Sequence, residues 1–190
     1  MTKVSLDDHQ GPWTEEEFLA LDETNSRIEM INGGLWVSPG PNSPHQQISA
    51  RLSAALLPEA DKAELWVWPD MNVRLTPGTI MRPDLIIARG PRIVTVAEAS
   101  DVLLACEITS PSNLTMDRAL KKRLYADARI KWYLLVEPEM TRYESVTLHL
   151  FRLEADGYAT YAVAEGNETL TLDEPFPVAI QGNPLLGLRT

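Results

Sequence analysis

The sequence predicts one α/β domain spanning residues 1–190, with a mixed β-sheet flanked by helices and a C-terminal antiparallel β meander. Three observations lead to this fold class. Two continuous apolar runs, 83–88 and 102–108, are typical of strands buried on both faces of a sheet. Around them lie capped segments with the apolar periodicity of helices. Residues 146–172 alternate between apolar and polar types around turn residues, which indicates antiparallel strands.

Three segments begin with residues that cap helices. Thr14 and the glutamate three residues later form a capping box, which predicts a helix over about 15–22. Ser43 is expected to cap a second helix, with Pro44 at its first helical position, where the missing N–H costs nothing. A third helix is predicted over Thr115–Ala128, with the threonine as its cap.

Strands are predicted where β-branched, aromatic and other apolar residues gather between turn residues. Asn32-Gly33-Gly34 marks a hairpin between the first two strands, and Asp156-Gly157 and Gly166-Asn167 mark the turns of the meander. The predicted strands are 27–31, 35–37, 64–68, 71–75, 83–88, 102–108, 131–136, 146–153, 158–164 and 169–172.

The chain has a net charge of −10, which argues against general binding to nucleic acids. The charge is unevenly distributed, however. Residues 118–131 contain six basic residues and one acid, and residues 74–92 contain four basic residues and one acid. Residues 137–174 contain nine acids and two arginines. The two basic segments could contact phosphate groups, although a charged helix face that is merely solvated explains them equally well.

Other features bear on the cellular compartment. The single cysteine, Cys106, lies in an apolar run and has no partner for an intrachain disulfide, which fits a reducing compartment. Residues 1–13 are polar, so we expect a flexible N-terminal arm and no signal peptide. No segment approaches the roughly 20 apolar residues of a membrane span. We therefore expect a cytoplasmic protein that does not interact with membranes.

Asp84 and Glu107 are carboxylates at positions where an apolar strand favours none. Asp84 precedes Leu85-Ile86-Ile87-Ala88, and Glu107 nearly ends the run 102–108. An ionised carboxylate there is costly unless a cation or hydrogen-bond donors compensate it. Hard divalent cations prefer oxygen ligands, so two such carboxylates on neighbouring strands indicate a metal site. Pro-Asp is also common at strand starts, so Asp84 alone equally admits a structural interpretation.

Short motifs follow one another in the order of a known family. Ile-Thr-Ser-Pro-Ser follows Glu107, and Asp117, Lys121 and Tyr125 come after it at four-residue intervals. The chain resembles the Uma-two family of restriction endonucleases, a bacterial branch of the PD-(D/E)XK nuclease superfamily, from about Thr14 to Leu188. The matching pieces are Arg27-Ile28-Glu29-Met30-Ile31-Asn32-Gly33, Ser43-Pro44-His45, Pro83-Asp84, Glu107 to Ser112, Asp117, Lys121, Tyr125, Glu137-Pro138 and Pro175-Phe176-Pro177-Val178.

The resemblance implies a restriction-endonuclease-like fold with a curved sheet, and a site for Mg²⁺ that Mn²⁺ could also fill. Asp84, Glu107 and the main-chain carbonyl of Ile108 would hold the metal. Glu29 would be the additional acid of the superfamily. Lys121 would position the attacking water or stabilise the developing negative charge. If the three acids converge without an ion, we expect them to repel one another and to raise one another's pKa values.

Further residues complete the predicted site. Thr109 occupies the place of the superfamily's Glu-x-Lys lysine, but this branch commonly takes its lysine from the following helix, where Lys121 lies. Simple helix pairing of Lys121 with an aspartate four residues earlier is the alternative. Packing is the alternative for Tyr125, and helix-start packing is the alternative for His45. The residues expected around the catalytic set are His45, Asp117, Tyr125 and Thr109, and those expected to contact DNA are Lys122, Arg118, Arg123 and Arg82.

The leading hypothesis is therefore a metal-dependent endonuclease that hydrolyses phosphodiester bonds in DNA. A homodimer is consistent with it, because enzymes that cut both strands often act in pairs. The first alternative is a catalytically inactive nuclease-fold module that binds nucleic acid or a protein partner, which the acidic net charge favours. The second alternative is a metal-dependent hydrolase of another phosphate ester.

Overall fold

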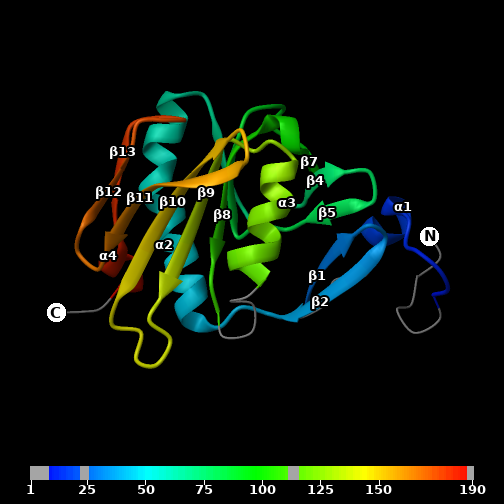
Figure 1. Ribbon diagram of the computed structural model, residues 1–190, viewed down its shortest axis with the longest axis horizontal. Helices are drawn as coiled ribbons and strands as arrows, with labels where there is room; N and C mark the ends of the chain where they lie inside the picture. The colour runs from blue at the N-terminus through cyan, green and yellow to red at the C-terminus, as the bar shows by residue number, and fades with distance from the viewer. Residues whose placement is uncertain (1–8, 22–25, 111–115, 188–190) are drawn as a thin grey trace.

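The computed structural model describes residues 9–21, 26–110 and 116–187, and in the last range the side chains from residue 119 onward. Within these residues the strands form a six-stranded main sheet, a five-stranded small sheet and a separate pair. Helices lie on both faces of the main sheet (Figure 1). The predicted α/β class, with a mixed sheet flanked by helices, is confirmed.

The main sheet is built around the two apolar runs of the sequence, which lie next to each other in antiparallel register. The second run is parallel to the following strand. Parallel neighbours need a crossover connection, and the helical segment between them provides it. In spatial order the strands are β11 (Gly157–Glu165), β10 (Val146–Glu154), β9 (Trp132–Pro138), β8 (Val102–Ile108), β6 (Leu85–Ala88) and β3 (Trp66–Pro69).

The small sheet carries the predicted N-terminal hairpin, which turns at Asn32 and Gly33 in left-handed conformations. The hairpin extends away from the main sheet (Figure 1). The register joining it to the next strand is a single pair, Met30 with Ile80. Two short strands of this sheet, β5 (Thr79–Met81) and β7 (Ala97–Glu98), are not predicted from the sequence. In spatial order the strands are β2 (Gly34–Pro39), β1 (Ser26–Ile31), β5 (Thr79–Met81), β4 (Val73–Thr76) and β7 (Ala97–Glu98), the last of which leads through η1 (Ala99–Asp101) into β8.

The predicted second helix forms, but its cap is different. Helix α2 (Ser43–Lys62) is capped by Asn42, whose side chain accepts a hydrogen bond of 3.0 Å from the main-chain N–H of His45. The prediction that Ser43 is the cap is therefore wrong by one residue. Asparagine is as good a cap as serine, so the sequence pattern alone could not separate the two.

The third helical segment has two parts. Residues Met116–Lys121 form a π-helical stretch, η2, and Lys122–Asp127 continue it as the α-helix α3. Thr115, the predicted cap, lies outside the described residues. After α3, Arg129 takes a left-handed φ of 63°, in a position where helices usually have glycine. π-Helical turns are frequent at functional sites, and this one ends at Lys121.

Alternate residues of β8 face two different cores. Cys106 and Ile108 belong to the core under α2, whereas Ala105 belongs to the core that contains Tyr125 of α3. This alternation follows from the two-residue period of a strand, and it explains why the whole run is apolar. Glu107 is on the same face of the strand as Ala105, so it points towards α3.

The remaining elements lie at the two ends of the chain. Helix α1 (Glu15–Leu19) has the predicted capping box but ends before residue 22, which lies outside the described residues. Strands β10 and β11 pair antiparallel as expected. Strand β12 (Thr169–Leu172) pairs with β13 (Val178–Gln181), which the sequence analysis missed, and α4 (Gly182–Leu186) follows. No helix in the described part of the chain is both long and apolar enough to span a bilayer.

We predict that Asn42→Ala destabilises the protein by about 1 kcal/mol, because the N–H of His45 loses its acceptor at the start of α2. Ser43→Ala is the matched control and should change the free energy of unfolding by less than about 0.5 kcal/mol. Urea denaturation followed by circular dichroism measures both. A larger loss in the Ser43 variant than in the Asn42 variant would contradict this assignment of the cap.

Candidate active site

The register of the main sheet brings Asp84 and Glu107 to the same level. Leu85 of β6 pairs with Cys106 of β8 in antiparallel register. Asp84, which immediately precedes β6, therefore lies opposite Glu107 near the end of β8. Both side chains are buried, with exposed fractions of 3% and 0%. Burial of two carboxylates this close together requires compensating charges or donors.

Strand β1 of the small sheet contributes two more charged residues. Ile28 and Met30 point into a separate small core, so Arg27 and Glu29 point to the other face of the strand. There the Nη1 atom of Arg27 donates to the Oδ1 atom of Asp84. An oxygen of Glu29 accepts a hydrogen bond of 2.8 Å from the main-chain N–H of Arg82.

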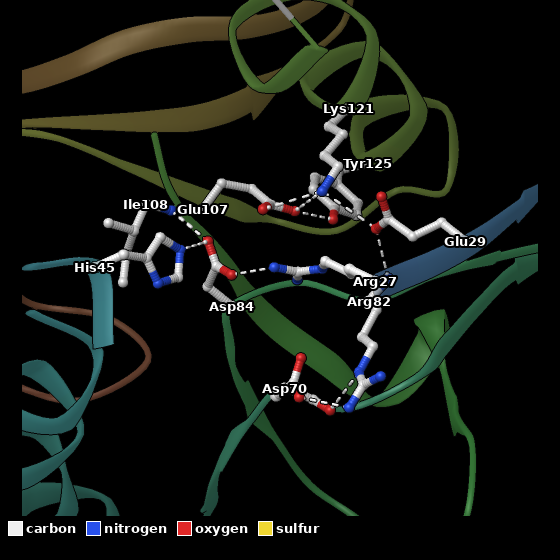
Figure 2. A network of polar contacts seen from close by, with 10 residues as sticks. All are labelled: Arg27, Glu29, His45, Asp70, Arg82, Asp84, Glu107, Ile108, Lys121 and Tyr125. Carbon is white, nitrogen blue, oxygen red and sulfur yellow. Dashed lines mark hydrogen bonds and ion pairs between the residues drawn. The ribbon is translucent and has the colours of Figure 1, made fainter. Parts of the chain in front are cut away.

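The end of η2 supplies a lysine to the same group. The Nζ atom of Lys121 lies 3.1 Å from a carboxylate oxygen of Glu29 and 3.2 Å from an oxygen of Glu107. One turn later, the Tyr125 hydroxyl donates to Glu107. Figure 2 shows that Lys121 approaches between the two acids, with Tyr125 beside it. A buried lysine thus links an acid of the small sheet to an acid of the main sheet.

The remaining contacts of Asp84 come from α2 and β8. The Nε2 atom of His45 lies 3.1 Å from the Oδ2 atom of Asp84, and the main-chain N–H of Ile108 donates to the same oxygen at 2.7 Å. His45 is in the first turn of α2, where the positive end of the helix dipole also favours a carboxylate. Both oxygens of Asp84 therefore have protein donors (Figure 2).

Comparisons with known proteins identify a matching family model and a similar solved structure. The model of the Uma2 family, described as "Putative restriction endonuclease", matches residues 15–187. The chain belongs to the Uma2 family. A crystal structure from Anabaena variabilis, described as that of "a putative nuclease belonging to DUF820", is similar, with a TM-score of 0.67 and 19% identity over 86% of this chain and 90% of that chain. The similarity supports a restriction-endonuclease-like fold. No match is found among curated proteins.

The four residues predicted as catalytic in this Uma2 chain are buried close together: Lys121 pairs with Glu29 and Glu107, and Asp84 lies opposite Glu107. Tyr125 contacts Glu107, and His45 contacts Asp84. Thr109 is buried, and its main-chain N–H donates to the carbonyl of Val136. Thr109 has no described bond to Glu29, Asp84, Glu107 or Lys121. The same is true of Lys122 and Arg123, which are predicted to contact DNA. The side chains of Asp117 and Arg118 lie outside the described residues.

The predicted DNA-contacting residues have other contacts in the structure. The ammonium group of Lys122 lies 3.4 Å from the centre of the Phe151 ring. Arg123 is exposed and pairs with Asp127 on the same helix. The guanidinium group of Arg82 pairs with the side chain of Asp70 and is more than one-third exposed. These contacts are at or near the surface, so each cation could exchange its partner for a phosphate group.

The sequence analysis missed Arg27, although its strand contained a signal. In Arg27-Ile28-Glu29-Met30, charged and apolar residues alternate, so one face of the strand carries both charges. Charged side chains on one face of a buried strand are costly unless that face contacts other charges, so Arg27 and Glu29 together predict such a contact. Glu29 is identified through the family resemblance, and the two-residue period of a strand places Arg27 on the same face as Glu29.

The electrostatics of Asp84 differ from the sequence-based expectation. Burial alone would raise the pKa of Asp84, but the charge of Arg27 and the hydrogen bond from His45 hold that pKa well below its ordinary value. The expected mutual repulsion of the acids is therefore outweighed at Asp84. For Arg27, burial works to lower the pKa, but the charges of Asp84, Glu107 and Glu29 raise it well above its ordinary value.

Tyr125 remains a hydrogen-bond donor under all ordinary conditions. Burial, followed by the charges of Glu107 and Glu29, raises the pKa of its hydroxyl well above its ordinary value. A protonated phenol can only donate to the Glu107 carboxylate, so it fixes the orientation of that group. The alternative that Tyr125 merely packs is thus incomplete, because its hydroxyl also contacts a residue of the site.

The chemistry of the site suits a hard divalent cation. Glu29, Asp84 and Glu107 offer carboxylate oxygens, and the guanidinium of Arg27 already demonstrates that the cluster attracts a cation. Among the described residues, however, no three acidic, histidine or cysteine side chains converge as a ready-made cage. A bound ion would therefore need main-chain or water oxygens in addition to the carboxylates.

A cleft of about 510 Å³ opens beside Asp84. Arg27, His45, Arg82 and Asp84 line it, together with Gln46 and Ser49 of α2. Its size lies within the range of small-molecule sites. The cleft reaches the buried site on the side of Arg27, His45 and Asp84, whereas Glu29, Glu107 and Lys121 do not line it.

We predict that Asp84→Asn lowers the free energy of unfolding at pH 7 by about 3–5 kcal/mol without added metal, because Arg27 loses its buried counter-charge. The pKa of Asp84 is depressed in the folded state, so its stabilisation is present above the ordinary carboxyl pKa of 3.8 and lost as the pH falls below it. Urea denaturation in EDTA should therefore show the gap between the two proteins narrowing below about pH 4.

The matched control for this prediction is Asp70→Asn, because Asp70 also pairs with an arginine but is exposed. Exposed ion pairs contribute less than about 1 kcal/mol. The free energy of unfolding of this variant should therefore be close to that of the wild type both at pH 7 and below about pH 4. An Asp84→Asn protein that is as stable as the wild type at pH 7 would show that repulsion among the acids, as the sequence analysis expected, outweighs the ion pair.

Proposed function

We propose that this protein is a metal-dependent endonuclease that hydrolyses phosphodiester bonds in DNA, with Mg²⁺ as the natural ion and Mn²⁺ as a substitute. One observation carries the proposal. Glu29, Asp84, Glu107 and Lys121 come from four separate segments of the chain and are buried together, with Lys121 paired to Glu29 and Glu107 and with Asp84 opposite Glu107. Membership of a family described as "Putative restriction endonuclease" supports the same reaction class.

The ion would be held by Asp84, Glu107 and the main-chain carbonyl of Ile108, with Glu29 bound directly or through water. Oxygen donors of this kind suit Mg²⁺, which also keeps several of its waters. When bound, the ion would supply charge neutralisation on the phosphate and a more acidic water. The reaction requires both the charge neutralisation and the more acidic water, because a water must attack phosphorus while the bond to the leaving oxygen breaks.

The chain's own residues contribute position and charge. Lys121 lies between Glu29 and Glu107, so its ammonium can hold a water or stabilise negative charge that develops on the phosphate. Tyr125 fixes Glu107, and His45 fixes Asp84. Rigid support of this kind matters, because catalytic groups lose much of their effect when they shift by about 1 Å.

DNA is the substrate that best fits the distribution of charge. The overall charge of −10 disfavours phosphate backbones, but residues 118–131 and 74–92 carry positive excesses. Arg82 lies in the cleft beside Asp84, and Arg118, Lys122 and Arg123 belong to the helical segment that carries Lys121. A homodimer would let two sites act on the two strands of a duplex.

A catalytically inactive, nuclease-fold module that binds nucleic acid or a protein is the second candidate. The observation that favours it is the complete pairing of Asp84 with protein donors, together with the absence of a three-ligand cage among the described residues. An assay for cleavage separates the two candidates directly.

We predict that the protein cleaves single- or double-stranded DNA with Mg²⁺ or Mn²⁺ and not in EDTA. Glu107→Gln should lower turnover by roughly 10²–10³-fold or more, because it removes an anionic ligand of the ion that would neutralise charge on the phosphate. Glu154→Gln, on the exposed end of β10, is the control and should retain full activity. Gel assays with each ion measure the rates. Cleavage that persists in EDTA would refute the metal requirement.

We predict different effects for two neighbouring lysines. Lys121→Ala should remove most turnover, because its ammonium contacts both Glu29 and Glu107. Lys122→Ala should leave turnover nearly unchanged but weaken DNA binding and reduce its salt slope by about one. Single-turnover kinetics and fluorescence anisotropy at several salt concentrations measure the two effects. Equal losses of turnover in both variants would contradict the assignment of Lys121.

A further inference from the structure

Arg27 is the least well accommodated residue of the buried network. Its Nη1 atom donates to Asp84, but its Nε and Nη2 atoms are buried and have no hydrogen-bond partner among the described residues. The side chain is nine-tenths buried. A buried donor without a partner is unfavourable, and a guanidinium has five N–H groups to satisfy.

Lys121, the other cation of the network, is bound differently. Its ammonium lies within 3.2 Å of carboxylate oxygens from both Glu29 and Glu107. It therefore links two acids, whereas Arg27 has a described bond to one acid and only longer-range attraction to the other two. Of the two cations, Arg27 is the one that the site could release at the smaller loss of contacts.

The balance of charges in the network also identifies Arg27 as the cation that a divalent ion would replace. Three buried carboxylates, Glu29, Asp84 and Glu107, face two side-chain cations, Arg27 and Lys121. A divalent ion added to this set would leave an excess of positive charge in a buried site, whereas exchange of Arg27 for the ion would leave three charges of each sign. Since uncompensated charge is costly away from water, the exchange is favoured over the addition.

We propose that Arg27 is a resident counter-cation that the divalent ion must displace, so that Arg27 sets both the affinity and the charge requirement of the metal site. If a monovalent ion replaced Arg27, one positive charge would be exchanged for another and the bond between Arg27 and Asp84 would be lost, so the site would gain no charge compensation. If a divalent ion replaced Arg27, the site would gain one positive charge. The proposal rests on the proposed function, because the ion is the one that the nuclease reaction needs.

The surroundings of Arg27 are compatible with its displacement. Arg27 is one of the residues that line the cleft of about 510 Å³, so its side chain could move into that space. Displacement would also free the Oδ1 atom of Asp84, which Arg27 now occupies.

The first test is calorimetric titration of Mn²⁺ into the EDTA-treated, dialysed full-length protein. Arg27→Met removes the charge but keeps much of the side-chain length, and it should bind Mn²⁺ about tenfold more tightly or better than the wild type. Arg27→Lys keeps a competing charge and is the matched control, with an affinity within about threefold of the wild type. Equal or weaker binding by Arg27→Met would overturn the proposal.

The second test measures the wild-type protein, and a variant serves only to assign the signal. Nitrogen-15 NMR resolves arginine Nε–H signals, and the Arg27 signal is the one that disappears in Arg27→Lys. In EDTA this proton should exchange slowly with water, because the atom is buried. Saturating Mg²⁺ should shift the signal and accelerate its exchange by tenfold or more. An Arg27 signal that Mg²⁺ leaves unchanged would overturn the proposal.

The outcomes also separate this proposal from the proposed function. If the wild type binds Mn²⁺ and Glu107→Gln does not, but Arg27→Met binds no more tightly than the wild type, the metal site stands and displacement is refuted. If neither the wild type nor Arg27→Met binds Mn²⁺, the metal-dependent function itself fails, and displacement fails with it. Binding by Arg27→Met alone would support displacement in its strongest form.

Discussion

The site depends on the compensation of three carboxylates that the fold removes from water. Asp84 and Glu107 are brought together by strand register, and Glu29 reaches them from another sheet. Each of these acids would be costly to bury alone. The structure meets this cost with donors from every neighbouring element: Arg27 from β1, His45 from α2, Lys121 from η2 and Tyr125 from α3.

The features that the sequence predicted are those with a strong local signal. Continuous apolar runs identified β6 and β8, because only strands buried on both faces need them. Within such runs a carboxylate stands out, which made Asp84 and Glu107 the first candidates. Glu29 and Lys121 have no comparable signal of their own, and they were found through the order of family motifs. In the structure Lys121 pairs with Glu29 and Glu107, and Asp84 lies opposite Glu107.

The features that were missed depend on tertiary contacts or on small energy differences. Arg27 gains its role only from acids more than 50 residues away in the chain. Asn42 and Ser43 are equally good caps, so only the path of the chain into α2 decides between them. Strands β5, β7 and β13 are short, and their pairing partners determine them more than their composition does. The π-helical form of η2 likewise has no signature in the four-residue spacing of the motif.

The separation of the site between two sheets has a further consequence. Arg27 and Glu29 are on the N-terminal hairpin, whose register with the rest of its sheet is the single pair Met30 and Ile80. Asp84 and Glu107 are instead fixed by the extensive main sheet. Proteins open locally in cooperative units whose stabilities differ. Fraying of this one hairpin would dismantle the candidate site while most of the molecule stayed folded, so the integrity of the site and the global fold can be lost separately, at different temperatures.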